Sequence, residues 1–188
     1  MGKVGAGALA TLLGGIAYRL VVSGQLTLDT GIGRRVQPLG PLSMSIAADR
    51  ETVFDVIASP YLGRTPRALS AEIEVLERSS DMVLAAHRTP VAGGLVTTTL
   101  ETVRFEPPRQ VAFRLVRGPV PHVVERFTLD SESGSTRLGY EGELGTDFGA
   151  LGSRWGDVVA RTWVATVQDS FDRIRAEAER RAKAQITR

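Results

Sequence analysis

The chain has 188 residues, a length that suits one domain or one domain with an appendage. Arg173 and the residues after it hold six basic and two acidic side chains, so the rest of the chain has 17 basic against 19 acidic residues and a net charge of −2. This balance excludes a strongly basic nucleic-acid-binding fold. The absence of cysteine excludes disulfides and thiolate chemistry, and with only His87 and His122 as histidines we expect neither a metal nor a cofactor.

Residues 1–24 form a hydrophobic N-terminal segment. Residues 4–22 carry a single charge, on Arg19, and as a helix they would extend roughly 28 Å, close to the thickness of a hydrocarbon core. We therefore expect a single-pass membrane anchor. A cleaved signal peptide, and a helix that packs on the domain or lies flat, stay open as alternatives.

The charges that flank this segment predict its orientation. Arg19, Arg34 and Arg35 lie at or after its end and outnumber Lys3 and the amino terminus before it. This excess places the domain on the cytoplasmic side of a cell membrane. The alternatives to an anchor would make the protein cytoplasmic or secreted.

The next elements are a linker, a strand and a short helix. Residues 25–41 are rich in glycine and contain two prolines, which predicts a linker. Apolar and polar residues alternate over 42–48, which predicts the first strand. Asp49 is an N-cap candidate for a helix that Pro60 ends, and residues 61–70 follow as a loop or a broken helix.

A long β region comes next. Short turns separate six runs with strand patterning, at 71–78, 82–89, 95–106, 111–117, 120–130 and 136–144. Consecutive strands joined by short turns predict an antiparallel meander.

The chain ends in a helix. Apolar residues recur at a spacing of four, and finally three, at Trp155, Val159, Trp163, Val167, Phe171 and Ile174. This spacing predicts one face of a long amphipathic helix. Because one helix cannot cover both faces of so many strands, we expect the sheet to curl around it. The predicted fold is α+β: a curved antiparallel sheet of six to seven strands around one C-terminal helix, after a hydrophobic N-terminal helix.

Three segments resemble the START-related polyketide cyclase/dehydrase superfamily, also called SRPBCC. They are LSMSIAADRETVFDVIASP from Leu42, TTTLETVRFEPPRQVAFRL from Thr97, and STRLGYEGEL from Ser135, where the family commonly has glycine. The resemblance covers residues 42–182 and leaves 183–188 as a basic tail. It implies the helix-grip fold with an apolar cavity between sheet and helix. The family includes lipid carriers, hydrophobic-ligand binders and aromatic polyketide cyclases.

Strand alternation indicates which polar side chains point inward. Glu101 shares a face with Phe105, and Glu125 shares a face with Phe127. If this aromatic face is the inner one, both carboxylates enter the cavity, where burial raises the pKa of an unpaired carboxylate and permits acid–base chemistry. The alternative is that they lie in water or pair with an arginine.

Further candidates follow from the same alternation. Arg117 is predicted to cap the cavity mouth and to pair with Glu125 or with an acidic ligand group. Tyr140 is predicted to point inward, either as a plain core residue or with its hydroxyl free for a ligand. His87 is a candidate general base, with a structural role as the alternative. The candidate catalytic residues are Glu101, Glu125, His87 and Tyr140. The candidate ligand-binding residues are Phe105, Phe113, Arg117, Glu125, Phe127, Tyr140, Trp155, Val159, Trp163 and Val167.

Three functions remain open at this point. The favoured one is binding of a small hydrophobic molecule or lipid, at a membrane reached through the N-terminal segment, with no nucleic-acid partner. The second is an enzyme of the cyclase/dehydratase type that uses the cavity carboxylates, Tyr140 or His87. The third is an accessory domain whose cavity is filled by side chains. The volume of the cavity and the titratable groups that face it distinguish the three.

Overall fold

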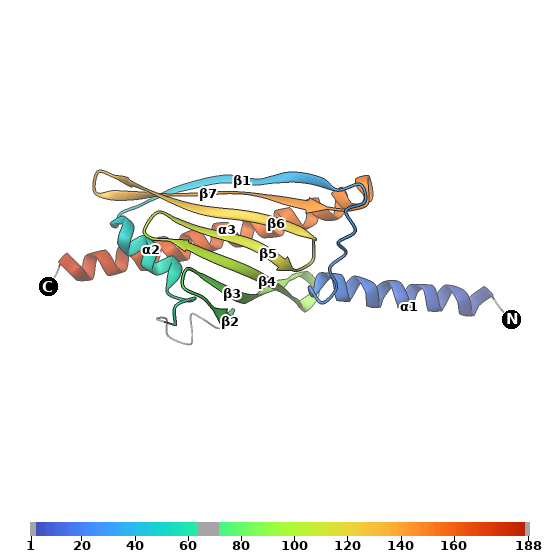
Figure 1. Cartoon of the computed structure of the whole chain (residues 1–188). Coiled ribbons are helices and arrows are strands. Elements are labelled where there is room, and N and C mark those ends of the chain that lie inside the picture. The colour runs from blue at the N-terminus through green and yellow to red at the C-terminus, as the bar shows by residue number, and fades with distance from the viewer. Residues whose placement is uncertain (1–2, 64–71, 187–188) are drawn as a thin grey trace.

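Seven strands form one antiparallel sheet that curves around a long C-terminal helix, as the sequence predicts (Figure 1). The computed structural model describes residues 3–63 and 72–186. The strands follow the order β1-β7-β6-β5-β4-β3-β2 across the sheet. Their bounds are β1 Arg35–Ile46, β2 Ile73–Arg78, β3 Met82–Val91, β4 Leu95–Glu106, β5 Gln110–Arg117, β6 His122–Glu132 and β7 Ser135–Thr146. The helices are α1 Lys3–Val22, α2 Arg50–Ala58, the single turn η1 Ala92–Gly94 and α3 Gly149–Ile186.

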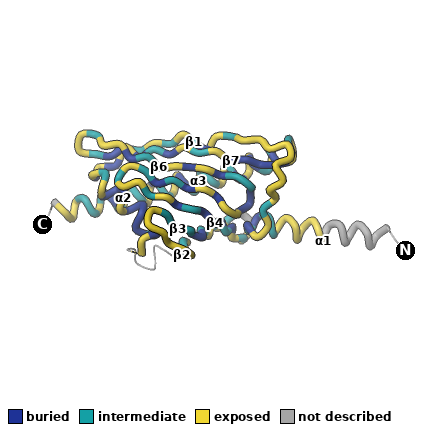
Figure 2. The backbone as a smooth tube through the Cα atoms, viewed as in Figure 1, coloured by how far each residue is buried: buried dark blue, intermediate teal, exposed yellow. Residues whose placement is uncertain are grey.

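The core lies between the inner face of the sheet and α3. Burial alternates along the strands, so that every second residue of β4 from Thr97 to Val103 is buried (Figure 2). Phe127 of β6 packs against Phe171 of α3, with ring centroids 5.7 Å apart. The short helix α2 closes one end of this space with a buried face that includes Val53 and Ile57. Asp49 caps it as predicted, because its side chain accepts a hydrogen bond from Thr52 N at 2.7 Å.

The first strand begins inside the stretch that the sequence predicts as a linker. β1 starts at Arg35, where it pairs with Thr146 of β7. Leu39 is only 1% exposed within this early part of the strand. The glycines and prolines of 25–41 are typical of a linker, so the sequence did not indicate this strand. In the structure Gly40 adopts a positive φ of 88° at an irregularity of the strand between Leu39 and Leu42.

A carboxylate at the end of β7 holds the segment before β1. Asp147 accepts hydrogen bonds from the backbone amides of Thr30, at 2.6 Å, and Gly31, at 2.8 Å. It also pairs with Arg34, whose Nε lies 2.7 Å from Asp147 Oδ1. These contacts fix the chain between α1 and β1 against the body of the domain.

The N-terminal helix extends away from the body, and only its last turns contact the rest of the chain (Figure 1). Within the described residues, no helix is both long and apolar enough to cross a bilayer, so the predicted transmembrane anchor at 1–24 lacks support from the structure. Val22 is buried, and its carbonyl accepts a hydrogen bond from Thr97 Oγ1 at 2.7 Å. The ring of Tyr18 meets that of Trp155 edge to face, with centroids 6.4 Å apart.

Candidate functional site

A cavity of about 420 Å³ lies between the sheet and α3. Strands β2 to β6 form one wall, and residues of α3 between Trp155 and Arg181 form the other. Ser59, Pro60 and Tyr61 line it after the end of α2, and Tyr18 and Val22 of α1 line it as well. The side chains of this domain therefore do not fill the space, in contrast to the accessory-domain alternative.

Most of the predicted ligand-binding residues line this cavity. Seven of the ten do so: Phe113, Glu125, Phe127, Trp155, Val159, Trp163 and Val167. They come from β5, β6 and the predicted inner stripe of α3. Most of the lining surface is apolar, but the strands and Tyr61 bring several titratable groups inward, and α3 adds hydroxyl and charged side chains. The geometry of those groups decides what the site can do.

Glu125 is the polar side chain of β6 that faces the cavity, and it is 8% exposed. Its Oε2 accepts two hydrogen bonds, from the hydroxyl of Tyr140 at 2.7 Å and from Nε1 of Trp163 at 2.6 Å. Burial raises the pKa of Glu125 to about 7, and the negative charge of Glu101 acts in the same direction. The two hydrogen bonds oppose this shift without cancelling it. Glu125 therefore gains or loses a proton close to neutral pH.

His87 and Glu101 form a second polar group on the neighbouring strands β3 and β4. His87 Nδ1 lies 2.9 Å from Glu101 Oε2, and Thr99 donates a hydrogen bond to Glu101 Oε1 at 2.7 Å. Burial works against ionisation of both groups, but each charge stabilises the other. The net result is a raised pKa for His87 and a lowered pKa for Glu101. Both shifts favour the ion-paired form, with His87 protonated and Glu101 ionised.

Tyr61 extends this pair toward the cavity. Its hydroxyl lies 3.0 Å from Nε2 of His87, and burial raises its pKa well above the usual value, so it stays a phenol. When His87 is charged, Nε2 donates to the Tyr61 oxygen, and the phenol proton is left for another acceptor. Arg78 donates a hydrogen bond to the Tyr61 carbonyl and helps to hold the residue in place.

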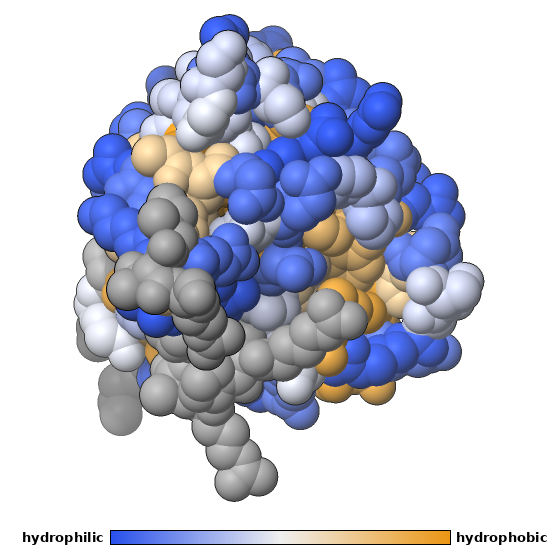
Figure 3. Space-filling model, turned by 90° about the vertical axis from the view of Figure 1, so that its left-hand side faces the viewer, coloured by the Kyte–Doolittle hydropathy of each residue, from blue (hydrophilic) through white to orange (hydrophobic). Residues whose placement is uncertain are grey.

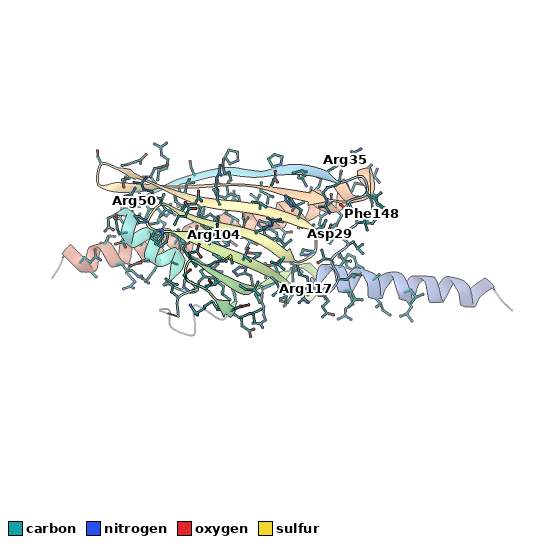
Figure 4. All side chains as sticks on the ribbon, in the orientation of Figure 1. Asp29, Arg35, Arg50, Arg104, Arg117 and Phe148 are labelled. Carbon is teal, nitrogen blue, oxygen red and sulfur yellow. The ribbon has the colours of Figure 1, made fainter. Side chains whose placement is uncertain are left out.

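Three predicted ligand-binding residues do not line the cavity. Phe105 packs against Tyr61, with centroids 5.9 Å apart, at the margin of the site. The sequence suggested that the Tyr140 hydroxyl could be free for a ligand. In the structure it instead donates a hydrogen bond to Glu125. Arg117 neither caps the mouth nor pairs with Glu125. It is exposed at the end of the molecule from which α1 extends (Figure 4).

The register of β5 explains the error at Arg117. Leu115 pairs with Glu101, but Arg117 pairs with Leu100, so the ladder slips by one residue between them. This irregularity turns Val116 and Arg117 both to the outside, whereas strict alternation would turn Arg117 inward with Leu115. His122 lies near the surface, with Nε2 2.8 Å from Oε1 of Glu143.

Among the cavity residues that sequence patterns missed, three lie outside the regular elements of the sheet and α3. Tyr61 belongs to a stretch predicted as a loop or broken helix, and no periodicity assigned its side chain a direction. Tyr18 and Val22 belong to the segment predicted as an anchor, yet both line the cavity. The one sequence feature that could have singled out Tyr61 is its position, as an aromatic residue directly after Pro60, where the predicted helix ends.

Charged side chains surround one end of the cavity. Figure 3 views the molecule from the end at which α3 finishes, and hydrophilic side chains cover most of that face, with hydrophobic groups visible between them. The basic residues that line the cavity each form an ion pair: Arg88 with Glu74, Arg173 with Glu72, and Arg181 with Glu177. Each of these arginines therefore has an acidic partner, and Glu177 is shared with Arg180.

Comparison with known proteins agrees with this architecture. The family model described as polyketide cyclase / dehydrase and lipid transport matches residues 42–179. No curated protein matches the chain in sequence.

Solved structures show the same fold at low sequence identity. The Zhui aromatase/cyclase from Streptomyces sp. R1128 is 21% identical, with a TM-score of 0.60 over 79% of this chain and 95% of that one. TTHA0849 from Thermus thermophilus is 16% identical, with a TM-score of 0.60 over 76% and 97%. Ara h 8.0201 is 13% identical, with a TM-score of 0.52 over 80% and 99%.

Proposed function

Because the chain belongs to the polyketide cyclase/dehydrase and lipid transport family, we propose that it binds a small hydrophobic molecule or lipid between the sheet and α3. The observation that carries this proposal is the cavity itself. Its volume of about 420 Å³ lies within the range of small-molecule sites, and its lining is mainly apolar. Burial of apolar ligand surface supplies the affinity, and the few inward polar groups orient the ligand.

The test uses Nile red, an uncharged apolar dye whose fluorescence rises in apolar surroundings. Val167 is 6% exposed and lines the cavity, so Val167→Phe should fill part of the space and weaken dye binding at least tenfold. Val116 is 58% exposed on the outer face of β5, and Val116→Phe serves as the matched control with unchanged binding. Equal affinities for the two variants would contradict binding in this cavity.

A second candidate function is an enzyme of the cyclase/dehydratase type. The observation that favours it is the pairing of Glu125, which titrates near neutral pH, with the Tyr61–His87–Glu101 group in the same cavity. Glu125 is suited to take and return a proton, and the Tyr61 hydroxyl is suited to donate to a carbonyl oxygen of the substrate. Glu125→Gln should then lower turnover by about a hundredfold while Nile red affinity changes by less than about tenfold.

Attachment to a membrane stays a prediction of the sequence. The exposure of Leu12, Leu13 and Ile16 on the part of α1 that extends beyond the body supports it. The deletion described in the Discussion tests it.

A further inference from the structure

The charges inside the cavity do not balance once Glu125 is ionised. Glu101 is matched by His87, and Tyr61 stays neutral. The basic lining residues at the rim are matched by Glu72, Glu74 and Glu177. Among the described residues, no basic side chain forms an ion pair with Glu125. The cavity therefore holds one negative charge that the described part of the protein does not compensate.

The uncompensated carboxylate also presents an unused oxygen. Both of its donors, Tyr140 and Trp163, bind the same atom, Oε2. Oε1 accepts no hydrogen bond from any described residue. It keeps some accessible surface, because it is not one of the fully enclosed polar atoms that lack a partner. A side chain that is more than nine-tenths buried thus presents a free acceptor to an apolar cavity.

A cation satisfies this site better than a neutral donor does. A neutral hydroxyl would supply one hydrogen bond to Oε1 but would leave the charge in apolar surroundings. An ammonium group supplies the hydrogen bond and the opposite charge together, and bonds between charged partners are about twice as strong as neutral ones.

We propose that the ligand of this cavity is a monocationic amine with an apolar body, its ammonium group bound to Oε1 of Glu125. This inference rests on the proposed function, because it names the chemical class of ligand for the same cavity. The apolar body lies among Phe113, Phe127 and the inner stripe of α3. The other groups that face Glu125 are Tyr140 from β7, Trp163 from α3, Glu101 from β4 and His87 from β3.

Two probes of equal size and shape test the proposal by displacement of Nile red at about pH 8. The amine 2-(1-naphthyl)ethylamine is protonated there, as a lysine side chain is, and 2-(1-naphthyl)ethanol is neutral. The amine should bind at least about tenfold more tightly than the alcohol. In Glu125→Gln this preference should fall below about threefold, with the affinity for the alcohol little changed.

Tyr140→Phe is the matched control. It removes the hydrogen bond that Tyr140 donates to Glu125 but keeps the carboxyl group, so the preference for the amine should persist. Equal binding of amine and alcohol by the wild-type protein would overturn the proposal while leaving hydrophobic binding intact. A preference that survives in Glu125→Gln would also overturn it. If neither Nile red nor either probe binds, the proposed function itself fails.

A calorimetric measurement on the unaltered chain keeps the test decisive even if Glu125→Gln does not fold. At pH 7 an ammonium ligand stabilises the carboxylate form of Glu125 and should release about half a proton per ligand bound, since its pKa is about 7. Titrations in phosphate and in Tris buffer, which differ in ionisation enthalpy, measure this release. The alcohol should release no proton. At the measured midpoint of the Glu125 titration, amine binding without proton release would contradict an ammonium on Glu125.

Discussion

The carboxylate of Glu125 lowers the stability of the fold above neutral pH, and Glu125→Gln should remove this effect. The pKa of this group is about 7 in the folded protein, against an ordinary value of 4.5. A carboxyl group whose pKa is raised by folding contributes its full stabilisation when the pH is below its unfolded-state pKa. That contribution is lost as the pH rises through the folded-state value. The difference of 2.5 units corresponds to about 3 kcal/mol at 1.36 kcal/mol per unit.

Glutamine keeps the shape and retains an oxygen that can accept from Tyr140 and Trp163. The unfolding free energy of Glu125→Gln relative to wild type should therefore rise by about 3 kcal/mol between pH 4.5 and pH 8. Urea unfolding followed by far-ultraviolet circular dichroism at the two pH values measures this change.

Glu141→Gln provides the matched control on the adjacent strand. Its side chain is 54% exposed, and its difference from wild type should stay within about 0.5 kcal/mol at both pH values. The reasoning is refuted if the stability difference between Glu125→Gln and wild type is the same at both pH values. Glu125 would then ionise in the folded protein as easily as in the unfolded chain.

The other predictions concern the core, the segment before β1 and the N-terminal helix. Phe171 is 3% exposed and packs against Phe127, so Phe171→Ala should lower the unfolding free energy by about 3–5 kcal/mol in urea titrations. Val158 is 45% exposed, and Val158→Ala should lower the unfolding free energy by less than about 1 kcal/mol. Asp147→Ala removes the hydrogen-bond acceptor of Thr30, Gly31 and Arg34, and should lower the unfolding free energy by more than about 2 kcal/mol at neutral pH. Because the pKa of Asp147 is lowered in the folded protein, this loss of stability should shrink only in strong acid. Deletion of residues 1–24 should leave the circular dichroism of the domain intact and move the protein from the membrane fraction to the soluble fraction. Soluble full-length protein in the absence of detergent would contradict the predicted attachment.

The sequence was sufficient to predict the parts of the site that depend on regular periodicity. Alternation along β4 and β6 predicted that Glu101 and Glu125 share the inner face with aromatic residues, and both are buried there. The spacing of apolar residues predicted the inner stripe of α3, including Trp163. These predictions succeed because one face of each element must be buried, and a slip of one residue would reverse every side chain.

The same periodicity fails where the ladder is irregular or where no element exists. The slip between Leu100 and Glu101 turned Arg117 outward, and nothing local in the sequence marks that slip. The ion pair of His87 with Glu101 depends on which strands are neighbours and on the register between β3 and β4. Tyr61 reaches His87 from outside any predicted element, so tertiary packing alone decides its position.

The state of Glu125 connects the stability of this protein to its function. At a site that served only to pack the core, glutamine would make the same hydrogen bonds without the cost of burying a charge. The glutamate instead destabilises the fold by about 3 kcal/mol at high pH and presents an unused oxygen to the cavity. His87, by contrast, has a buried counterion in Glu101, which favours its charged form and raises its pKa. Both proposed activities therefore depend on Glu125: a carrier would use its charge to hold a cationic ligand, and an enzyme would use its proton.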